Sequence, residues 1–66
     1  MDTEEAIDRG IKFLEKTGYY TYKLESIKLE GDIWIVRFNV GFLEDARVEL
    51  KIDDDTGRVI SYDQPR

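Results

Sequence analysis

The acidic run 53–57, Asp-Asp-Asp-Thr-Gly, is the first place in this chain where residue types and spacing could do chemistry. Carboxylates just before a glycine resemble a calcium loop. An EF-hand loop needs oxygen ligands at alternate positions before its glycine and a bidentate glutamate six residues after it. Counted from Gly57, the first ligand position falls on Ile52 and the last on Asp63, so the match fails. Asp and Gly also favour turns for backbone reasons. We therefore predict a turn, with no metal and no other cofactor.

Paired carboxylates can also do acid–base work. The pairs and runs at 4–5, 44–45 and 53–55 are all expected at exposed ends and loops. Carboxylates in such positions make poor catalysts at neutral pH. The chain has no His to activate Ser26 or Ser61, and no Gly-rich phosphate loop. We predict that the protein is not an enzyme.

Several aromatic side chains could form a stacking surface, namely Tyr19, Tyr20, Tyr22, Trp34 and Tyr62. Proteins that bind single-stranded nucleic acid by stacking also carry a basic groove. This chain has a net charge of −5, and no cluster of Lys and Arg stands out along it. Nucleic-acid affinity depends on neutralising phosphates. We predict no nucleic-acid partner and interpret the aromatics as core and rim packing. The tyrosines near Gly18, together with Tyr62, are candidates to line one edge of a groove between helix and sheet.

Length and composition predict one domain, residues 1–66, with a small apolar core. There is no Cys, so stability must come from that core, from surface ion pairs or from self-association. Charged residues make up 38% of the chain, and Asn and Gln occur once each. This composition is typical of proteins from heat-loving organisms and predicts thermostability.

The longest apolar run, 33–36, is far too short to span a bilayer. The chain opens Met-Asp-Thr-Glu-Glu, the opposite of a basic signal-peptide start. These features predict no membrane partner and a cytoplasmic location.

A helix is expected over residues 3–17. Asp2 and Glu5 have the spacing of a capping box, and Gly18 is suited to a left-handed cap. Apolar residues recur at helical spacing at Ile7, Ile11 and Leu14. Gly10 lies in mid-helix, where Gly costs roughly 1 kcal/mol against Ala. It is either a tolerated defect or a point of close contact between helix and sheet. We favour the contact, because Gly10 shares a helix face with Ala6 and Phe13.

After Gly18 the apolar period changes to two, and four strands are expected, over 20–30, 33–42, 47–53 and 58–62. Residues 64–66 are expected to form a tail. In the second strand one face carries Trp34, Val36, Phe38, Val40 and Phe42. With the next loop centred near Leu43, the core pairs are Trp34 with Ile52, Val36 with Leu50, and Phe38 with Val48. The other face then pairs Arg37 with Glu49, so both faces agree on one register.

The first hairpin has two alternatives. A three-residue turn at 30–32 pairs Leu24 with Phe38 and Tyr22 with Val40. It places four apolar residues on the outer face, a candidate interaction surface: Ile27, Leu29, Ile33 and Ile35.

A two-residue turn at 31–32 instead brings Leu29 to Trp34 and Ile27 to Val36 in the core. It then needs a bulge near Glu25 and Ser26. We favour this bulged form because it buries more apolar surface. In either form, Ile33 and Ile35 remain on the outer face.

An N-terminal helix with small residues, Ala6 and Gly10, is followed by Gly18, by Trp34-Ile-Val-Arg-Phe-Asn-Val, and by Ile52-Asp-Asp-Asp-Thr-Gly-Arg-Val. This pattern resembles the PepSY family over most of the chain. PepSY domains occur in propeptides of secreted metallopeptidases and in cell-envelope proteins, where inhibitory or protein-binding roles are proposed. The resemblance implies such a role here and no catalytic residues. The central Trp and the late strand pair also resemble a small gas-vesicle accessory family.

The expected fold is therefore α+β, with an N-terminal helix packed on one face of a four-stranded antiparallel meander. The expected function is a non-enzymatic protein-binding or regulatory module. The alternative is a homo-oligomeric structural protein, such as a homodimer, that associates through its open sheet face or an edge strand. Small-ligand binding between helix and sheet ranks third, because a core of this size leaves little room for a cavity.

Overall fold

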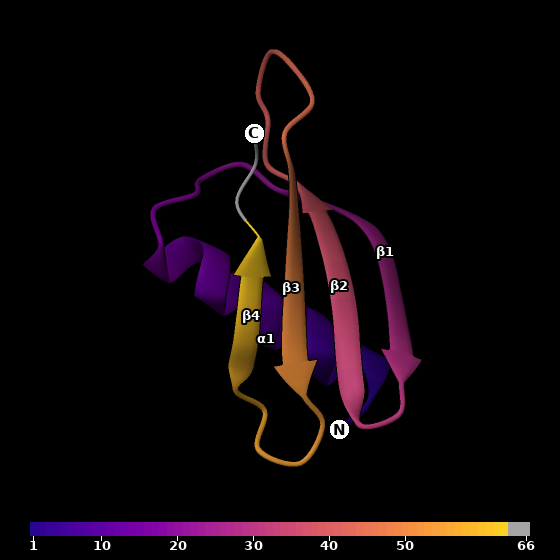
Figure 1. Ribbon diagram of the computed structural model, residues 1–66. Helices are drawn as coiled ribbons and strands as arrows, with labels where there is room; N and C mark the ends of the chain where they lie inside the picture. The colour runs from indigo at the N-terminus through magenta and orange to yellow at the C-terminus, as the bar shows by residue number, and fades with distance from the viewer. Residues whose placement is uncertain (64–66) are drawn as a thin grey trace.

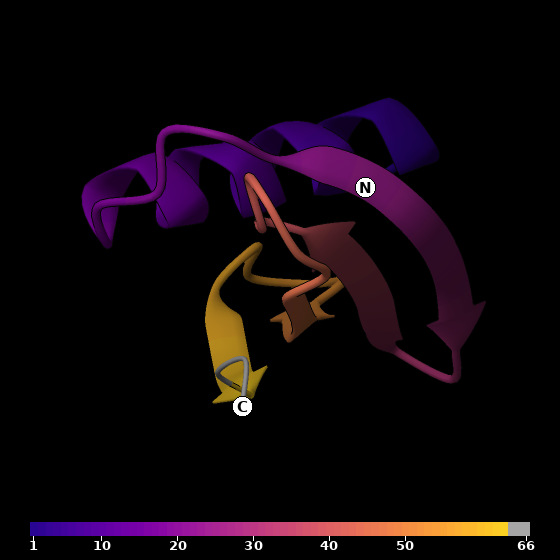
Figure 2. The same cartoon turned by 90° about the horizontal axis from the view of Figure 1, so that it is seen from above.

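The computed structural model describes residues 1–63 and shows one helix packed on a four-stranded antiparallel sheet (Figure 1). The elements in chain order are α1 (Thr3–Lys16), β1 (Lys23–Glu30), β2 (Ile33–Asn39), β3 (Arg47–Asp53) and β4 (Val59–Asp63). The strand order is β1-β2-β3-β4, a meander. The helix covers one face of the sheet (Figure 2). The α+β prediction is confirmed, while the predicted tail at 64–66 lies outside the described residues.

Both ends of α1 are closed by the residues expected to close them. The Asp2 carboxylate accepts a hydrogen bond from the backbone N–H of Glu5 at 2.8 Å, as an N-cap does. At the other end, Gly18 adopts a positive φ of 95°. The N–H of Tyr19 then donates to the carbonyl of Leu14 at 3.0 Å. This left-handed closure ends the helix and turns the chain toward β1.

The core lies between α1 and the helix-facing side of the sheet. Its fully buried large side chains are Phe38, Leu14, Leu50, Ile52, Val36 and Val48. Gly10 lies directly over Phe38, and a Cβ added there would be 2.8 Å from Cε2 of the ring. Gly10 therefore marks a close approach of helix and sheet, and the prediction of close contact is confirmed.

The β2–β3 register is the one that both faces of the sequence pattern predicted. The core pairs are Trp34 with Ile52, Val36 with Leu50, and Phe38 with Val48. On the open face Arg37 pairs with Glu49, and their Nη2 and Oε1 atoms lie 3.9 Å apart. The predicted second strand was too long, however. It ends at Asn39 instead of residue 42, and Phe42 is 82% exposed instead of facing the core.

The first hairpin adopts the bulged form. Its register shifts between Leu24 and Ser26, and it pairs Leu29 with Trp34 and Ile27 with Val36. Gly31 supplies the tight turn with a φ of 60°. The alternative with four apolar residues on the outer face is therefore wrong, because the bulge rotates the second half of β1 toward the helix side.

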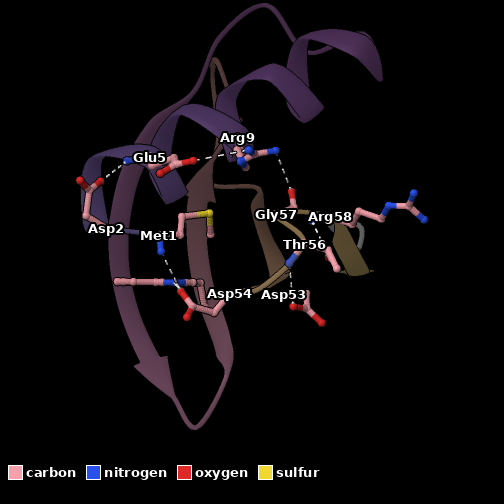
Figure 3. A network of polar contacts seen from close by, with 10 residues as sticks. Met1, Asp2, Glu5, Arg9, Asp53, Asp54, Thr56, Gly57 and Arg58 are labelled. Atoms are coloured by element: carbon pink, nitrogen blue, oxygen red, sulfur yellow. Dashed lines mark hydrogen bonds and ion pairs between the residues drawn. The ribbon is translucent and has the colours of Figure 1, made fainter.

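The acidic run after β3 forms a turn, as predicted. The Asp53 carboxylate accepts hydrogen bonds from the N–H groups of Asp55 and Thr56, at 2.8 and 3.1 Å. Asp54 points the other way (Figure 3): its Oδ1 accepts from the Trp34 indole at 2.7 Å and lies 3.5 Å from the Met1 ammonium. The carboxylates of Asp53 and Asp54 therefore already interact with backbone and side-chain donors of the chain itself. Within residues 1–63, no group of three or more Asp or Glu side chains is arranged to hold a metal ion.

Candidate interaction surfaces

The four residues predicted as an interaction surface are divided between the two faces of the sheet. Ile27 and Leu29 pair with core residues of β2 and lie on the helix side, whereas Ile33 and Ile35 lie on the open side. Ile35 is only 9% exposed. The register places Lys28 and Lys51 on either side of it, and lysine stems commonly cover neighbouring apolar surface. The open face therefore presents less apolar surface than the sequence predicted.

The β1 edge exposes apolar side chains, with Leu24 at 37% and Leu29 at 48%. It also carries the bulge at Glu25 and the lysines Lys23 and Lys28. Bulges and edge lysines are the devices by which natural sheets prevent another strand from pairing. Although β1 is an edge strand with exposed leucines, its backbone is poorly suited to receive an added strand.

The most exposed apolar pair in the described chain lies on the loop between β2 and β3, which projects beyond the end of the sheet (Figure 1). Phe42 is 82% exposed and Leu43 is 91% exposed. We refer to these two residues as the apolar tip. Tyr20, at 92% exposure, lies in the loop that precedes β1. That loop is joined to the base of the β2–β3 loop, because the Thr21 hydroxyl donates to the Val40 carbonyl at 3.1 Å.

The loop that carries the apolar tip is tied together by one side chain at its base. The Asn39 Oδ1 atom accepts from the N–H of Gly41 at 3.0 Å and from that of Ala46 at 3.3 Å, while Nδ2 donates to Asp45 at 3.0 Å. The Val40 N–H donates to the Ala46 carbonyl at 2.8 Å. At Gly41 a Cβ would collide with the backbone carbonyl of Glu44, so glycine permits the tight path. The apolar tip therefore lies on a loop whose base is held together by hydrogen bonds.

The base of this loop is acidic and partly ion-paired. Arg47 Nε donates to the Glu25 carboxylate at 2.6 Å, and Arg47 Nη2 lies 3.9 Å from Asp45 Oδ2. The hydrogen bond and the charge of Glu25, followed by the charge of Asp45, raise the pKa of the Arg47 guanidinium above its ordinary value. Within residues 1–63, no ion pair engages Glu44, which follows the apolar tip directly. Negative charge therefore lies directly beside the apolar tip.

A second surface feature, a groove of about 400 Å³, lies between α1 and the start of β4. Its apolar lining comes from Phe13 and Val59, and its polar lining is entirely cationic: Arg9, Lys12, Lys16 and Arg58. We refer to it as the basic groove. Gly57 completes the lining. No acidic side chain of the described chain lines it.

The basic groove is built by contacts between helix and turn. Arg9 Nη1 donates to the Gly57 carbonyl at 3.3 Å, and Nη2 lies 3.4 Å from Glu5 Oε1 (Figure 3). Gly57 has a φ of 72°, and a Cβ there would lie 2.5 Å from Cζ of Arg9. The positive φ of the turn favours glycine, and the absence of a Cβ also lets the guanidinium lie this close. This contact holds the β3–β4 turn against the helix.

Contrary to the prediction, no tyrosine of the described chain lines the basic groove. Tyr62 instead packs against Phe13, which does line it. The Phe13 and Tyr62 rings meet edge to face with centroids 5.2 Å apart. The Tyr19 and Tyr62 hydroxyls share a hydrogen bond of 2.6 Å. Burial, and to a lesser extent this hydrogen bond, raises the pKa of Tyr62 to about 12.

Sequence reasoning missed both the apolar tip and the basic groove. The signal for the groove was present in part, since positions 9, 12 and 16 share one face of a helix. Nothing in the sequence showed that Arg58 would join them. For the tip, the signal was Gly41 with Asn39 before it, a pair that favours a turn over a continued strand.

In comparisons with known proteins, no protein-family model, curated protein or solved structure matches the chain. In the part of the chain that the structure describes, no helix is long and apolar enough to cross a membrane.

Proposed function

We propose that this protein is a non-enzymatic, PepSY-like binding or regulatory module that inserts its apolar tip into an apolar pocket of a partner protein. One observation carries the proposal: Phe42 and Leu43 are adjacent, are 82% and 91% exposed, and sit on a loop held by hydrogen bonds. Scattered exposed apolar residues are normal on protein surfaces, but contiguous ones on a projecting element are typical of interaction sites. Burying Phe42 would provide the kind of aromatic anchor that dominates interface energetics.

The order in the loop strengthens the proposal. A binding loop that is already ordered loses less conformational entropy on association than a flexible one. Asn39 supplies that order through its contacts with Gly41, Asp45 and Ala46. We expect Asn39→Ala to weaken binding several-fold, although Asn39 lies at the base of the loop and not at its tip.

The charge around the tip indicates the chemistry of the partner. Glu44 and Asp45 follow the tip directly, and the whole chain has a net charge of −5. Complementary charges at the rim of an interface steer encounter and disfavour wrong partners. The proposed partner therefore offers an apolar pocket rimmed by Lys or Arg. The resemblance to PepSY domains supports the same class of function, including an inhibitory one.

Two finer expectations belong to this proposal. We propose that the protein is thermostable, supported by its 38% charged residues and by the small ion-pair network of Arg47 with Glu25 and Asp45. A thermal midpoint well above the range of mesophile domains, about 45–65 °C, would support it.

We also propose a cytoplasmic location, which imaging of a tagged protein in the source cells would test.

The test compares three purified proteins as bait in lysate of the source organism: the wild type, a Phe42→Ser/Leu43→Ser variant, and an Ile60→Ser control. Ile60 is also exposed, at 56%, but lies in β4. A protein retained by the wild type and the control, and lost with the tip variant, is then purified and titrated against all three by calorimetry. We expect the tip variant to bind at least about tenfold more weakly. Equal affinity of the tip variant and the wild type would overturn the proposal.

A further inference from the structure

We propose that the basic groove of one copy of this chain receives the apolar tip of a second copy, so that the protein associates with itself head to tail. The inference rests on the proposed function of the tip and names its partner. It differs from association through the open sheet face or an edge strand, because the two surfaces in contact are different parts of the molecule.

The groove has the chemistry that the tip requires of a partner. Phe13 and Val59 supply apolar surface, and four cationic side chains surround them. The loop supplies an aromatic and an aliphatic side chain, Phe42 and Leu43, followed directly by two carboxylates. Apolar surface and charge are therefore complementary at the same time, which is the condition for a specific contact rather than general adhesion.

Most of the cationic side chains that line the groove form no ion pair within the described part of their own chain. Residues 1–63 contain nine Lys and Arg side chains, and four of them form ion pairs: Arg9, Lys28, Arg37 and Arg47. Five have no ion pair within that part of the chain: Lys12, Lys16, Lys23, Lys51 and Arg58. Three of those five line the groove. In an acidic protein, this groove concentrates the positive charge that is available to an acidic loop.

The fold prevents one copy from filling its own groove. The β2–β3 loop, which carries the tip, projects before the start of β3 (Figure 1). The groove adjoins the β3–β4 turn, which follows the end of β3. Seven residues of strand separate the two ends of β3, which corresponds to roughly 20 Å. The contact must therefore form between copies. Such a heterologous contact leaves a free tip and a free groove at the ends, and it grows into chains or closes into a ring.

The size of the groove limits the strength of the contact. At about 400 Å³ it is near the lower end of the range for ligand pockets. It can hold the side chains of a loop tip but not a large interface. Small interfaces are weak and transient, so we expect dissociation constants on the order of 0.1 mM. Association should therefore appear only in concentrated solution.

The decisive experiment uses two variants that each keep one half of the contact. The tip variant, Phe42→Ser/Leu43→Ser, retains the groove. The groove variant, Lys12→Glu/Arg58→Glu, retains the tip. Sedimentation velocity at about 0.5 mM should show concentration-dependent association of the wild type and monomers of each variant alone. A one-to-one mixture should form a complex that stops at the dimer, because only one intact contact remains.

Controls separate this inference from general charge effects. A Lys23→Glu/Lys51→Glu variant has the same charge change outside the groove and should associate as the wild type does. If the charge-reversed groove variant does not fold by circular dichroism, Lys12→Gln/Arg58→Gln replaces it. In NMR spectra of labelled tip variant, unlabelled groove variant should shift the signals of Phe13 and Val59.

A wild type that stays monomeric at 0.5 mM, or a mixture of variants that does not associate, overturns head-to-tail association. The outcome also separates the two proposals. The wild type could prove monomeric while another protein binds it and requires the apolar tip for binding. In that case the proposed function is supported, and a second copy of this chain is excluded as the partner of the tip. If the tip variant still self-associates, the tip has no part in self-association.

Discussion

The close contact between Gly10 and Phe38 makes an unusual prediction for a glycine in a helix. Replacing a mid-helix glycine by alanine normally stabilises a protein, by about 1 kcal/mol. Here the added Cβ would lie 2.8 Å from Cε2 and 3.1 Å from Cζ of Phe38. We therefore expect Gly10→Ala to lower the free energy of unfolding.

The expected change in the free energy of unfolding is the sum of two opposing effects. Phe38 has no exposed surface and packs among the largest side chains of the core, so its ring cannot move aside into solvent. Inserting a methyl group into a filled core costs typically about 1–3 kcal/mol. The gain in helix propensity offsets about 1 kcal/mol of that cost. A net loss of about 1 kcal/mol is a substantial part of the roughly 3–10 kcal/mol expected for a domain of this length.

Urea unfolding followed by the fluorescence of Trp34, the single tryptophan, measures this change. A calibration within the same helix comes from Asp8, which is exposed. The difference in the free energy of unfolding between the Asp8→Ala and Asp8→Gly variants measures the effect of helix propensity at a position without core packing. A double-mutant cycle isolates the clash, because Phe38→Leu removes the ring atoms that the new Cβ would meet. In that background Gly10→Ala should become stabilising.

The prediction fails if Gly10→Ala raises the free energy of unfolding by as much as Asp8→Ala exceeds Asp8→Gly. Gly10 would then be a tolerated defect in the helix, and the close approach of helix and sheet would not require glycine. A coupling energy near zero between positions 10 and 38 would lead to the same conclusion.

Three further predictions follow from contacts around the β3–β4 turn and the groove. Asp54→Ala leaves the Trp34 indole N–H without its acceptor and should cost about 1–2 kcal/mol in urea unfolding, with a change in the fluorescence of the folded state. Gly57→Ala places a Cβ at positive φ against the Arg9 guanidinium and should cost at least about 1 kcal/mol in the same assay, whereas an unchanged midpoint would show that the turn adapts. The pKa of Tyr62 is raised to about 12 from 10.0, so the folded state favours the neutral phenol. Its contribution to stability is then complete below pH 10 and is lost as the pH rises through about 12, a decline that a Tyr62→Phe variant should not show.

The β2–β3 register could be predicted from the sequence because that strand pair carries two independent signals. In β2 and β3, the alternation of apolar residues and the Arg37–Glu49 charge pair require the same register, and the structure has that register. In β1, the apolar phase changes between Leu24 and Ile27, and a bulge is the way for a strand to accommodate such a change. Local pattern and global fold agree at these positions.

The candidate surfaces could not be predicted in the same way, because they depend on particular side-chain contacts and not on the apolar pattern. The alternation that ends at Phe42 is formally that of a strand. What ends the strand is the Asn39 amide, which binds backbone N–H groups on both sides of the loop. Similarly, Arg58 lines the same groove as the cations of α1 and follows Gly57, whose carbonyl accepts a hydrogen bond from Arg9. The first is a set of local side-chain hydrogen bonds and the second is a tertiary contact, and apolar periodicity encodes neither.

Photocrosslinking from the apolar tip can show whether the tip contacts a partner protein. The chain has no Cys, so Leu43→Cys and Ile60→Cys each introduce a single site for a benzophenone label. Irradiation in source-cell lysate, with unlabelled wild type as competitor, measures which site contacts a protein. We predict a discrete crosslinked protein from position 43 that the competitor abolishes, and none from position 60. Equal crosslinking from both positions, or none from position 43, would show that the apolar tip is not the binding surface.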